Sequence, residues 1–418
     1  MTISGKGLTR RSFLKSVIAG GLGLAAGSFK FYSGSASSPI TIGLQAELTG
    51  GLATYGYWHL RSARAAVSRI NSNGGIDGRK VELFHEDTET DPTTGSRKMR
   101  RLVLRRNADF VIGSQHSGVC LASLPVSRRF STPYFPIGEA TEITGSRGHE
   151  YVFRLNCSVE AHAQAGYSWV MDNMGSDWTI IYADYAMGQS AVKEWGSRVE
   201  MDGGRILDRI AVPQGTDDFG PYLRKVNPGD SDVLMIILYG PDALACLRRS
   251  AEMGLNEEMG LFGNTGSVEA LDIDFPGAEG LWSITNYPRR LEEVPEELAG
   301  FNGEFRDRVG VTPEGRGHEG KIIDASHFWA PWEIVNLLKR TVESTGWKQK
   351  GDNGELIEGL EGADLAGSLD FPQGDKYVRG IDHQGFHSQY VQKVEDGKLR
   401  VKEVLPPESS EYEPNAEL

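Results

Sequence analysis

Two short polar segments, each directly after an apolar run, carry the groups best suited to chemistry. The first, SQHSG at 114–118, follows the apolar run 110–112, and the second, GEAT at 138–141, follows the run 134–137. Both supply hydroxyls and backbone N–H groups, which can hold polar or charged parts of a ligand by hydrogen bonds. Neither contains a nucleophile beside a base. The pattern therefore predicts binding of a small molecule rather than its conversion.

The elements around these segments explain how they would come together. A helix-like segment, 119–130, and then Pro133 separate the two apolar runs, so the order is strand, loop, helix, strand, loop. Such a βαβ unit makes the two strands parallel and brings both polar segments to one edge of a sheet. Ligands of open α/β sheets bind outside the carboxyl ends of the strands. We therefore predict the binding site at this edge.

The same alternation extends over the rest of the chain, and its length suits two domains. Alternating strand and helix patterns predict an α/β fold with two doubly wound parallel sheets. The expected strands lie at 40–44, 80–85, 178–183, 206–212, 232–238, 280–285 and 386–394, and the expected helices at 57–71, 93–106, 190–201, 243–253 and 324–345.

The composition limits the possible partners. The formal net charge is −13, and residues 1–36 hold five basic and no acidic residues, so the rest of the chain is more acidic still. An acidic surface repels phosphate backbones and anionic lipid headgroups. We therefore predict no nucleic-acid partner and no peripheral membrane binding, and we expect a monomer.

The chain offers no sequence pattern for metal or covalent chemistry. Cys120, Cys157 and Cys246 are too few and too scattered for a disulfide framework or a zinc site. Buried free thiols are expected, with a single disulfide as the alternative. The sequence also lacks a nucleophile elbow and a phosphate-cradling loop outside the N-terminal segment. We predict no catalytic residue, no metal and no cofactor.

Residues 1–36 have the pattern of an export signal. The segment TRRSFLK at 9–15 resembles the twin-arginine motif, and the apolar segment 17–27 that follows is far too short to span a membrane. Small residues at 34–36 suit cleavage before Ser37. We therefore expect export of the folded protein by the twin-arginine route and an extracytoplasmic location.

A longer run of residues resembles a known family. The segment AAVSRINSNGGIDGRKVELFHEDTETDP at 65–92 is similar to the signature of type I periplasmic solute-binding proteins, in the leucine-binding protein-like branch for branched-chain amino acids and amides. The tip LTGG at 48–51, the strand end VIGS at 111–114 and the tip AT at 140–141 match that family in order. The similarity extends from about residue 40 to 400 and weakens after 290.

The resemblance implies two lobes joined by a three-strand hinge. We place the crossings near Asn156, Tyr287 and Phe371. The expected organisation is a signal peptide (1–36), a first lobe (37–156 and 288–371), a second lobe (157–287 and 372–405) and a mobile tail (406–418).

The resemblance also implies which strand-tip residues bind ligand in the first lobe. Relatives hold a ligand carboxylate or amide there, and Ser117, Ala140 and Thr141 occupy the matching positions. Tyr55 stands where relatives often place an aromatic ring against the ligand, although it could instead pack between the lobes. The first-lobe candidates are Tyr55, His116, Ser117, Gly118, Glu139, Ala140 and Thr141.

Two first-lobe candidates allow two interpretations each. His116 could contact ligand or sense pH, or it could make local loop hydrogen bonds. Glu139 replaces a small residue of the amino-acid-binding relatives. It could point to solvent, or it could recognise a cationic or donor-rich ligand.

The second-lobe candidates depart from the family in an informative way. They are Asp184, Tyr185, Met187, Tyr239 and Thr265, of which Tyr239 matches a ligand-facing tyrosine. Amino-acid binders carry a glutamate at Thr265 to neutralise the ligand's ammonium, and usually a tyrosine at Met187. A buried ammonium without a carboxylate is unfavourable. Either Asp184 or Glu139 supplies that charge, or the ligand is an amide, a urea-like compound or a carboxylic acid.

The resemblance implies transport rather than catalysis. We expect a substrate-binding protein of an ABC importer, which captures a small polar solute by hinge closure and presents it to permease and ATPase subunits at the membrane. The alternatives are a ligand-sensing receptor subunit of the same fold and, further from the pattern, an exported α/β enzyme.

Overall fold

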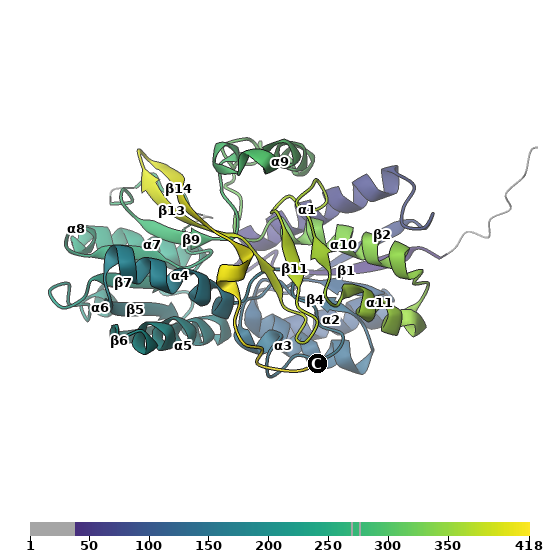
Figure 1. Cartoon of the computed structure of the whole chain (residues 1–418), viewed down its shortest axis with the longest axis horizontal. Coiled ribbons are helices and arrows are strands. Elements are labelled where there is room, and N and C mark those ends of the chain that lie inside the picture. Colours follow the sequence, from purple (N-terminus) through teal and green to yellow (C-terminus); the bar gives the residue numbers. More distant parts are fainter. Residues whose placement is uncertain (1–37, 269–270, 276) are drawn as a thin grey trace, which may run out of the picture. The chain divides into compact units, whose positions relative to one another are not determined.

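The computed structural model describes residues 38–268, 271–275 and 277–418. The expected export signal lies outside these residues. The described chain contains a four-stranded, a seven-stranded and a three-stranded sheet. Figure 1 shows the four-stranded and seven-stranded sheets in separate halves, each with its own helices.

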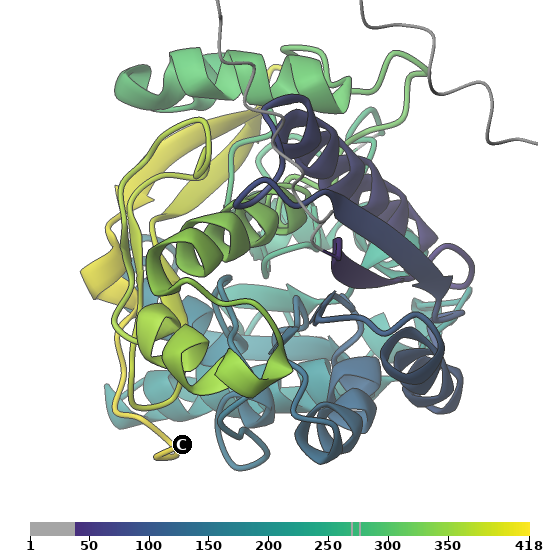
Figure 2. The ribbon, with the colours of Figure 1, turned by 90° about the vertical axis from the view of Figure 1, so that its right-hand side faces the viewer.

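The four-stranded sheet is parallel throughout and forms the centre of the first lobe. Its strands, in sheet order, are β2 (Val81–Asp87), β1 (Ile40–Ala46), β3 (Phe110–Ile112) and β4 (Tyr134–Phe135). The helices α1 (Ala53–Ser72) and α10 (Ala330–Thr345) pack together on one face (Figure 2), and α2 (Pro92–Arg105) and α3 (Ser117–Arg129) cover the other.

The residue alternation along β1 explains this layering. Ile40, Ile42 and Leu44 are fully buried in the core beneath α1 and α10. Gly43 faces the opposite way, where a Cβ atom would lie 3.1 Å from the Leu102 side chain of α2. Strand side chains alternate between the two faces of a sheet. The missing side chain therefore lets α2 approach the sheet closely.

The seven-stranded sheet forms the centre of the second lobe. Its strands, in sheet order, are β14 (Lys398–Leu405), β13 (Gln389–Glu395), β9 (Trp282–Thr285), β8 (Gly260–Gly263), β7 (Val233–Ile237), β5 (Asp177–Ala183) and β6 (Arg205–Val212). The five strands from β9 to β6 are parallel, and β13 and β14 form an antiparallel edge. One face carries α4 (Val159–Met174) and α5 (Ala186–Met201); the other carries α6 (Gly220–Leu223), α7 (Gly240–Glu252) and α8 (Leu255–Glu258).

The third crossing was expected near Phe371, but the chain enters the second lobe only after that residue. Residues after Phe371 first form β11 (Lys376–Val378) and β12 (Gly385–His387), which make a small antiparallel sheet with the preceding β10 (Asp364–Leu365). Only β13, from Gln389, pairs with β9 of the seven-stranded sheet. After Phe371 the chain therefore joins the seven-stranded sheet only beyond Ser388.

Two glutamine side chains tie the three crossing segments together. The Gln373 amide donates to the backbone oxygens of Asn286 and Ser388, at 3.0 and 2.8 Å. The Gln384 amide donates to the backbone oxygen of Asn156 at 2.8 Å. These bonds hold the crossing strands side by side.

Two C-terminal segments differ from their expected form. The expected helix 324–345 begins only at Ala330, with Pro331 in its first turn, where a missing N–H is tolerated. The tail expected to be mobile packs against both lobes: the Tyr412 ring lies against Phe386, and the Asn415 amide donates to Glu160 at 2.6 Å. Among the described residues, α9 (Glu296–Val309) and α11 (Asn353–Leu360) complete the set of α-helices.

Candidate functional site

The polar segments 114–118 and 138–141 lie side by side at the carboxyl edge of the four-stranded sheet. The backbone N–H groups of Glu139 and Ala140 both donate to the Ser117 hydroxyl oxygen, at 3.1 Å each. His116 caps the start of α3, because its Nδ1 accepts from the Val119 N–H at 3.3 Å. Burial lowers the pKa of His116, so its imidazole is neutral at pH 7. The predicted βαβ unit therefore forms, and the backbone N–H groups of Glu139, Ala140 and Val119 already have protein acceptors.

The Glu139 carboxylate lies at the junction of the two lobes. Its Oε1 atom is 2.7 Å from Nε2 of His327, which precedes α10, and 3.0 Å from Nε2 of His162 on α4. Its Oε2 atom accepts from the Tyr239 hydroxyl, after β7, at 3.3 Å. All four side chains are buried. Glu139 therefore does not point to solvent, and it bonds to both lobes at once.

The ionisable groups of this cluster shift one another's pKa values. Burial by itself raises the pKa of Glu139, but His327 and His162 outweigh it and lower the pKa to about 2. Burial alone lowers the pKa of His327, yet Glu139 and Asp324 raise it to about 10. The imidazoles of His327 and His59, 3.8 and 3.4 Å from the carboxylate of Asp324, likewise hold the pKa of Asp324 below its usual range against burial. At neutral pH the cluster holds two carboxylates with a charged histidine between them.

A second buried carboxylate, Glu47, follows β1. It accepts hydrogen bonds from the Ser114 hydroxyl and from the backbone N–H groups of Gln115 and His116, the last two at 3.3 Å each. Helix N-termini favour negative charge, so Glu47 occupies the anion position of α3. Gly56 of α1 makes room for it, since a Cβ atom there would lie 2.2 Å from the Glu47 carbonyl oxygen.

Aromatic side chains carry further contacts between the lobes. The Tyr55 hydroxyl of α1 donates to the Gly266 carbonyl oxygen at 2.9 Å and lies 3.3 Å from the Gly240 nitrogen. The Tyr185 ring stacks on His116, with ring centres 4.9 Å apart. The strand-tip loops of the two lobes are therefore in contact.

A cavity of about 390 Å³ lies between the lobes beside these contacts. The first lobe contributes the tip after β1 and the turn before α2, and the second contributes the tips after β5, β6 and β7. Its polar and aromatic lining is Glu89, Thr90, Tyr185, Gln214, Asp217, Tyr239 and Asp242.

The structure brings most of the predicted ligand residues together. Tyr55, His116, Ser117, Glu139, Tyr185, Met187 and Tyr239 all contribute to the interlobe contacts or lie against them, Met187 with its sulfur 3.3 Å from the Tyr239 hydroxyl. Gly118 lies in the first turn of α3, and Ala140 contributes its N–H to Ser117.

Three predicted residues stand apart from this group. Asp184 is exposed and accepts from the Gln189 side chain at 2.9 Å. Thr141 lines a different cavity of about 350 Å³ with Glu142 and Ser190. Thr265 is fully buried, and its hydroxyl has no hydrogen-bond partner among the residues that the structure describes.

Five residues of the buried cluster were not predicted from sequence. They are His162, His327, Asp324, Glu47 and His59, which lies beside Asp324. His162 lies inside a helix, and Asp324 and His327 lie in a segment expected to be helical, so no strand-tip pattern indicated them. Glu47 stands directly before the LTGG tip at 48–51. The pattern of a polar residue after an apolar strand, which identified the other tips, could also have indicated it.

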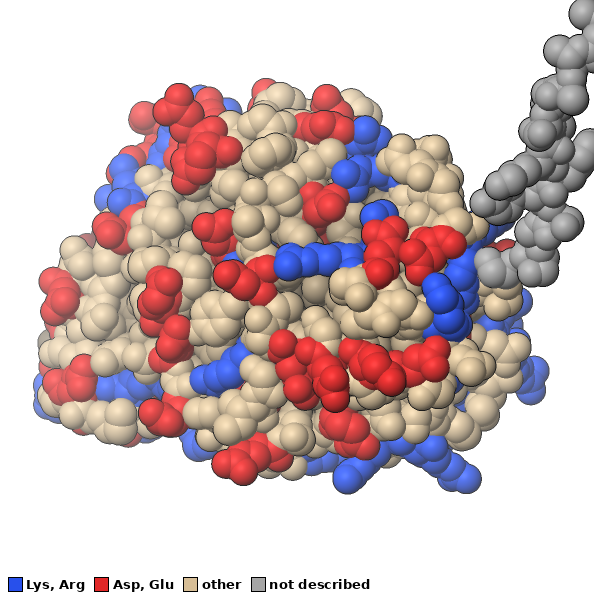
Figure 3. Space-filling model, turned by 45° about the vertical axis from the view of Figure 1, so that its right-hand side comes forward, with Lys and Arg blue, Asp and Glu red and all other residues tan. Residues whose placement is uncertain are grey.

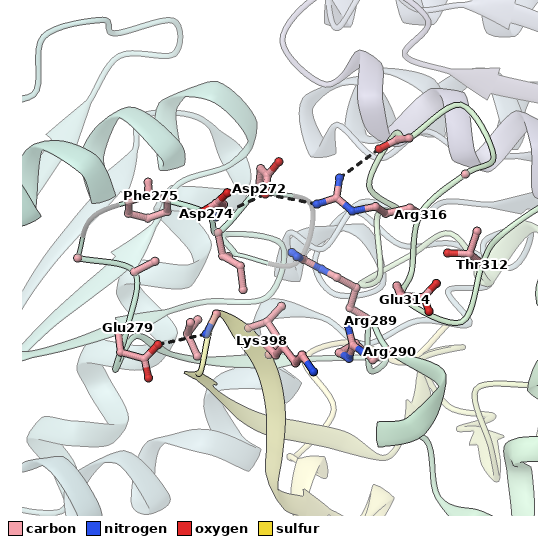
Figure 4. Close-up of a pocket in the computed structure, with 18 of the residues that line it drawn as sticks. Asp272, Asp274, Phe275, Glu279, Arg289, Arg290, Thr312, Glu314, Arg316 and Lys398 are labelled. Carbon is pink, nitrogen blue, oxygen red and sulfur yellow. Dashed lines mark hydrogen bonds and ion pairs between the residues drawn. The ribbon is translucent and has the colours of Figure 1, made fainter.

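A larger cavity, about 870 Å³, lies away from the predicted ligand residues (Figure 4). It adjoins the second crossing, and its side chains include both signs of charge, with Arg316 bonded to Asp272 at 3.4 Å. Arg289 is buried there and donates to the carbonyl oxygens of Val268 and Leu271. None of the twelve ligand candidates lines this cavity.

The cysteines are buried free thiols rather than a disulfide. Burial raises the pKa of Cys120 to about 11 and those of Cys157 and Cys246 to about 12. Within the described ranges, no three His, Cys, Asp or Glu side chains are grouped as metal ligands. No helix there is both long and apolar enough to cross a bilayer.

Two α/β lobes joined by three crossings, with loops facing across a cleft, define a two-lobed periplasmic binding protein. The family model described as periplasmic binding protein matches residues 39–398, and the chain belongs to that family. It is a binding protein, not an enzyme, of an extracytoplasmic family.

Curated relatives and solved structures agree with this assignment. The chain is 27% identical to Leu/Ile/Val-binding protein homolog 8 of Brucella suis over 349 residues, 77% of this chain and 85% of the relative. It is 23% identical to homolog 4 of Brucella abortus over 414 residues, 93% of this chain and 92% of the relative.

Two solved structures show the same fold at low identity. A solute-binding protein of an ABC transporter from R. palustris, in complex with benzoate, has a TM-score of 0.76 and 20% identity, covering 88% of this chain and 97% of its own. The branched-chain amino acid transporter substrate-binding protein LivJ of Streptococcus pneumoniae, in complex with isoleucine, has a TM-score of 0.71 and 20% identity, covering 88% and 100%.

Proposed function

We propose that the protein is the substrate-binding subunit of an ABC importer and captures a small polar solute between its lobes. The observation that carries the proposal is the meeting of strand-tip side chains across the cleft: Tyr55 reaches the second lobe, and Tyr239 and His162 reach Glu139 of the first. Seven of the twelve residues predicted from sequence take part in or lie against these contacts. The solute would pass unaltered to permease and ATPase subunits.

Hinge closure supplies the mechanism of this proposal. A solute that contacts both lobes favours the closed state by the difference between its affinities for the closed and open states. The crossings at Asn156, Tyr287 and Ser388, tied by Gln373 and Gln384, form the hinge. The lobes are then the residues up to 156 with 288–388, and 157–287 with the strands from Gln389.

The surface supports an extracytoplasmic binding protein without a polyanionic partner. Acidic and basic side chains are interleaved over the face shown in Figure 3, where no continuous basic area appears among the described residues. Together with the net charge of −13, this disfavours nucleic acid as a partner. The twin-arginine route and a monomeric state remain parts of the proposal.

The names of the relatives define the first solutes to test. Relatives are named for leucine, isoleucine and valine, and the solved structures hold benzoates or isoleucine. The screen should therefore include amino acids and carboxylic acids. Amides and urea-like compounds are added because the sequence analysis left them open.

Thermal unfolding with each compound tests the proposal directly. A solute at about 100 times its dissociation constant stabilises the folded protein by about 2.7 kcal/mol, and small-angle X-ray scattering should show a more compact protein with it. Chemical turnover of a stabilising compound, or stabilisation without any change in scattering, would contradict capture by hinge closure.

A further inference from the structure

Several groups of the first lobe that could hold a solute carboxylate already bond within the protein. Glu47 accepts from the N–H groups of Gln115 and His116 at the start of α3. The Ser117 hydroxyl oxygen accepts from the N–H groups of Glu139 and Ala140. A solute carboxylate at this edge would lie beside two buried carboxylates, those of Glu47 and Glu139.

The buried cations near this edge are also engaged. Arg154 donates to the carbonyl oxygens of Gly138 and Ala140, at 3.1 and 2.8 Å, and His327 bonds to Glu139. Buried cations that already have acceptors offer little to an incoming anion. The neutral His116 offers no full charge either.

The interlobe cavity has the opposite character. Three carboxylates line it: Glu89 from the first lobe, and Asp217 and Asp242 from the second. No lysine or arginine appears among the described residues of its wall. Asp242 is half-buried, and burial raises its pKa, so a cation nearby would stabilise its charged form.

The aromatic walls add an independent preference of the same sign. The rings of Tyr185 and Tyr239 line the cavity, and aromatic faces attract ammonium, guanidinium and quaternary ammonium groups. The Tyr239 hydroxyl donates to the buried Glu139 carboxylate, which fixes the position of this ring. The rings and the carboxylates that line the cavity therefore favour a ligand of the same charge.

We infer that the captured solute is an organic cation, an amine, guanidinium or quaternary ammonium compound, whose charged group lies in this cavity between the two tyrosines and the carboxylates of Asp217 and Asp242. The inference rests on the proposed function and names its solute class. The carboxylates of Asp217 and Asp242 also supply the negative charge that Thr265 lacks, at a position where amino-acid binders are expected to carry a glutamate. Asp184, the exposed candidate, is not needed for it.

The test compares probes of matched shape and different charge on the full chain. Choline, 3,3-dimethylbutan-1-ol and 3,3-dimethylbutanoate share one shape, and 1,5-diaminopentane, pentane-1,5-diol and pentanedioate share another; agmatine represents guanidinium compounds. Calorimetry and thermal unfolding measure binding of each. We expect choline or 1,5-diaminopentane to bind at least ten times more tightly than the neutral compound of the same shape, or agmatine to bind where the neutral and anionic probes do not. We expect the anions to show no binding.

Two variants locate the site. D217N and D242N keep the side-chain shape, and the amide oxygen that D242N introduces can still accept from the Gly215 N–H, the bond that Asp242 accepts at 2.9 Å. Each should weaken cation binding at least threefold, and both together at least tenfold. The control E403Q removes an equal charge from an exposed position of β14 and should leave cation binding unchanged.

The outcomes separate the inference from the proposed function. If amino acids, neutral solutes or anions bind with lobe closure and the cations do not, the solute class is wrong and the transport proposal stands. Cation binding that D217N and D242N leave unchanged also overturns the assigned site. If no compound of any class binds, both the solute class and the proposed function fail.

Discussion

Replacing Glu139 by glutamine tests whether its carboxylate holds the centre of the molecule together. The substitution keeps the shape but removes the charge that faces His327 at 2.7 Å and His162 at 3.0 Å. Breaking a buried ion pair from one side costs about 3–5 kcal/mol, because the remaining charge is left buried without its partner. Asp324 still faces His327 from the other side, so we expect a loss near the lower end of that range in the unfolding free energy.

The pH dependence of the unfolding free energy tests the same charge pair independently. His327 has its pKa raised from 6.5 to about 10, so the stability that its charge contributes is fully present below pH 6.5 and is lost as the pH rises through 10. The wild-type protein should therefore lose stability over this interval, and E139Q should lose distinctly less. Below pH 6.5 the difference between the two proteins should be largest.

Urea unfolding at pH 6.5 and pH 10 measures both quantities, with E403Q as the matched control for an exposed carboxylate. The variant H327Q and the double variant E139Q/H327Q complete a cycle, whose coupling free energy isolates the pair. A loss of less than about 1 kcal/mol in E139Q, or an unchanged pH slope, would refute the assignment of charge to this pair.

Three further perturbations follow from single contacts. Y55F removes the hydroxyl that bonds to Gly266, and calorimetry with the solute found in the screen should show affinity roughly threefold to tenfold weaker. S117A leaves two buried N–H groups without their acceptor, so urea unfolding should show a loss of about 1–3 kcal/mol. The buried thiols of Cys120, Cys157 and Cys246 should resist a disulfide reagent at about pH 8 in the native protein and react fully after unfolding. Rapid native labelling, unchanged unfolding of S117A or unchanged affinity of Y55F would each contradict the contact concerned.

The local pattern predicted the frame of the site but not where each strand ends. The apolar run 110–112 is the strand β3, as expected. The run 134–137 is a strand only to Phe135, because the N–H groups of Ile137 and Gly138 turn to the Ser114 carbonyl oxygen instead of continuing the ladder. A hydrogen-bond choice between neighbouring loops cannot be read from apolar residues alone.

The buried charge cluster could not be predicted from the sequence for a different reason. Glu139 was identified as a departure from the family, yet its partners lie 23 and 188 residues away in the sequence. No periodicity relates a strand tip to a histidine inside α4 or to one before α10. Pairing between such distant residues is fixed by the packing of the lobes, and one sequence does not record it.

The division of the Glu139 contacts between the lobes bears on how a solute can control closure. The bond to His327 is internal to the first lobe, whereas the bonds to His162 and Tyr239 cross to the second. Opening therefore leaves the strongest charge pair intact and breaks hydrogen bonds to a charged group worth about 1.5–3 kcal/mol each, which water replaces in part. A difference of that size is comparable to what a bound solute supplies. The cluster can thus stabilise the first lobe permanently while the open–closed equilibrium stays within the range that solute binding can shift.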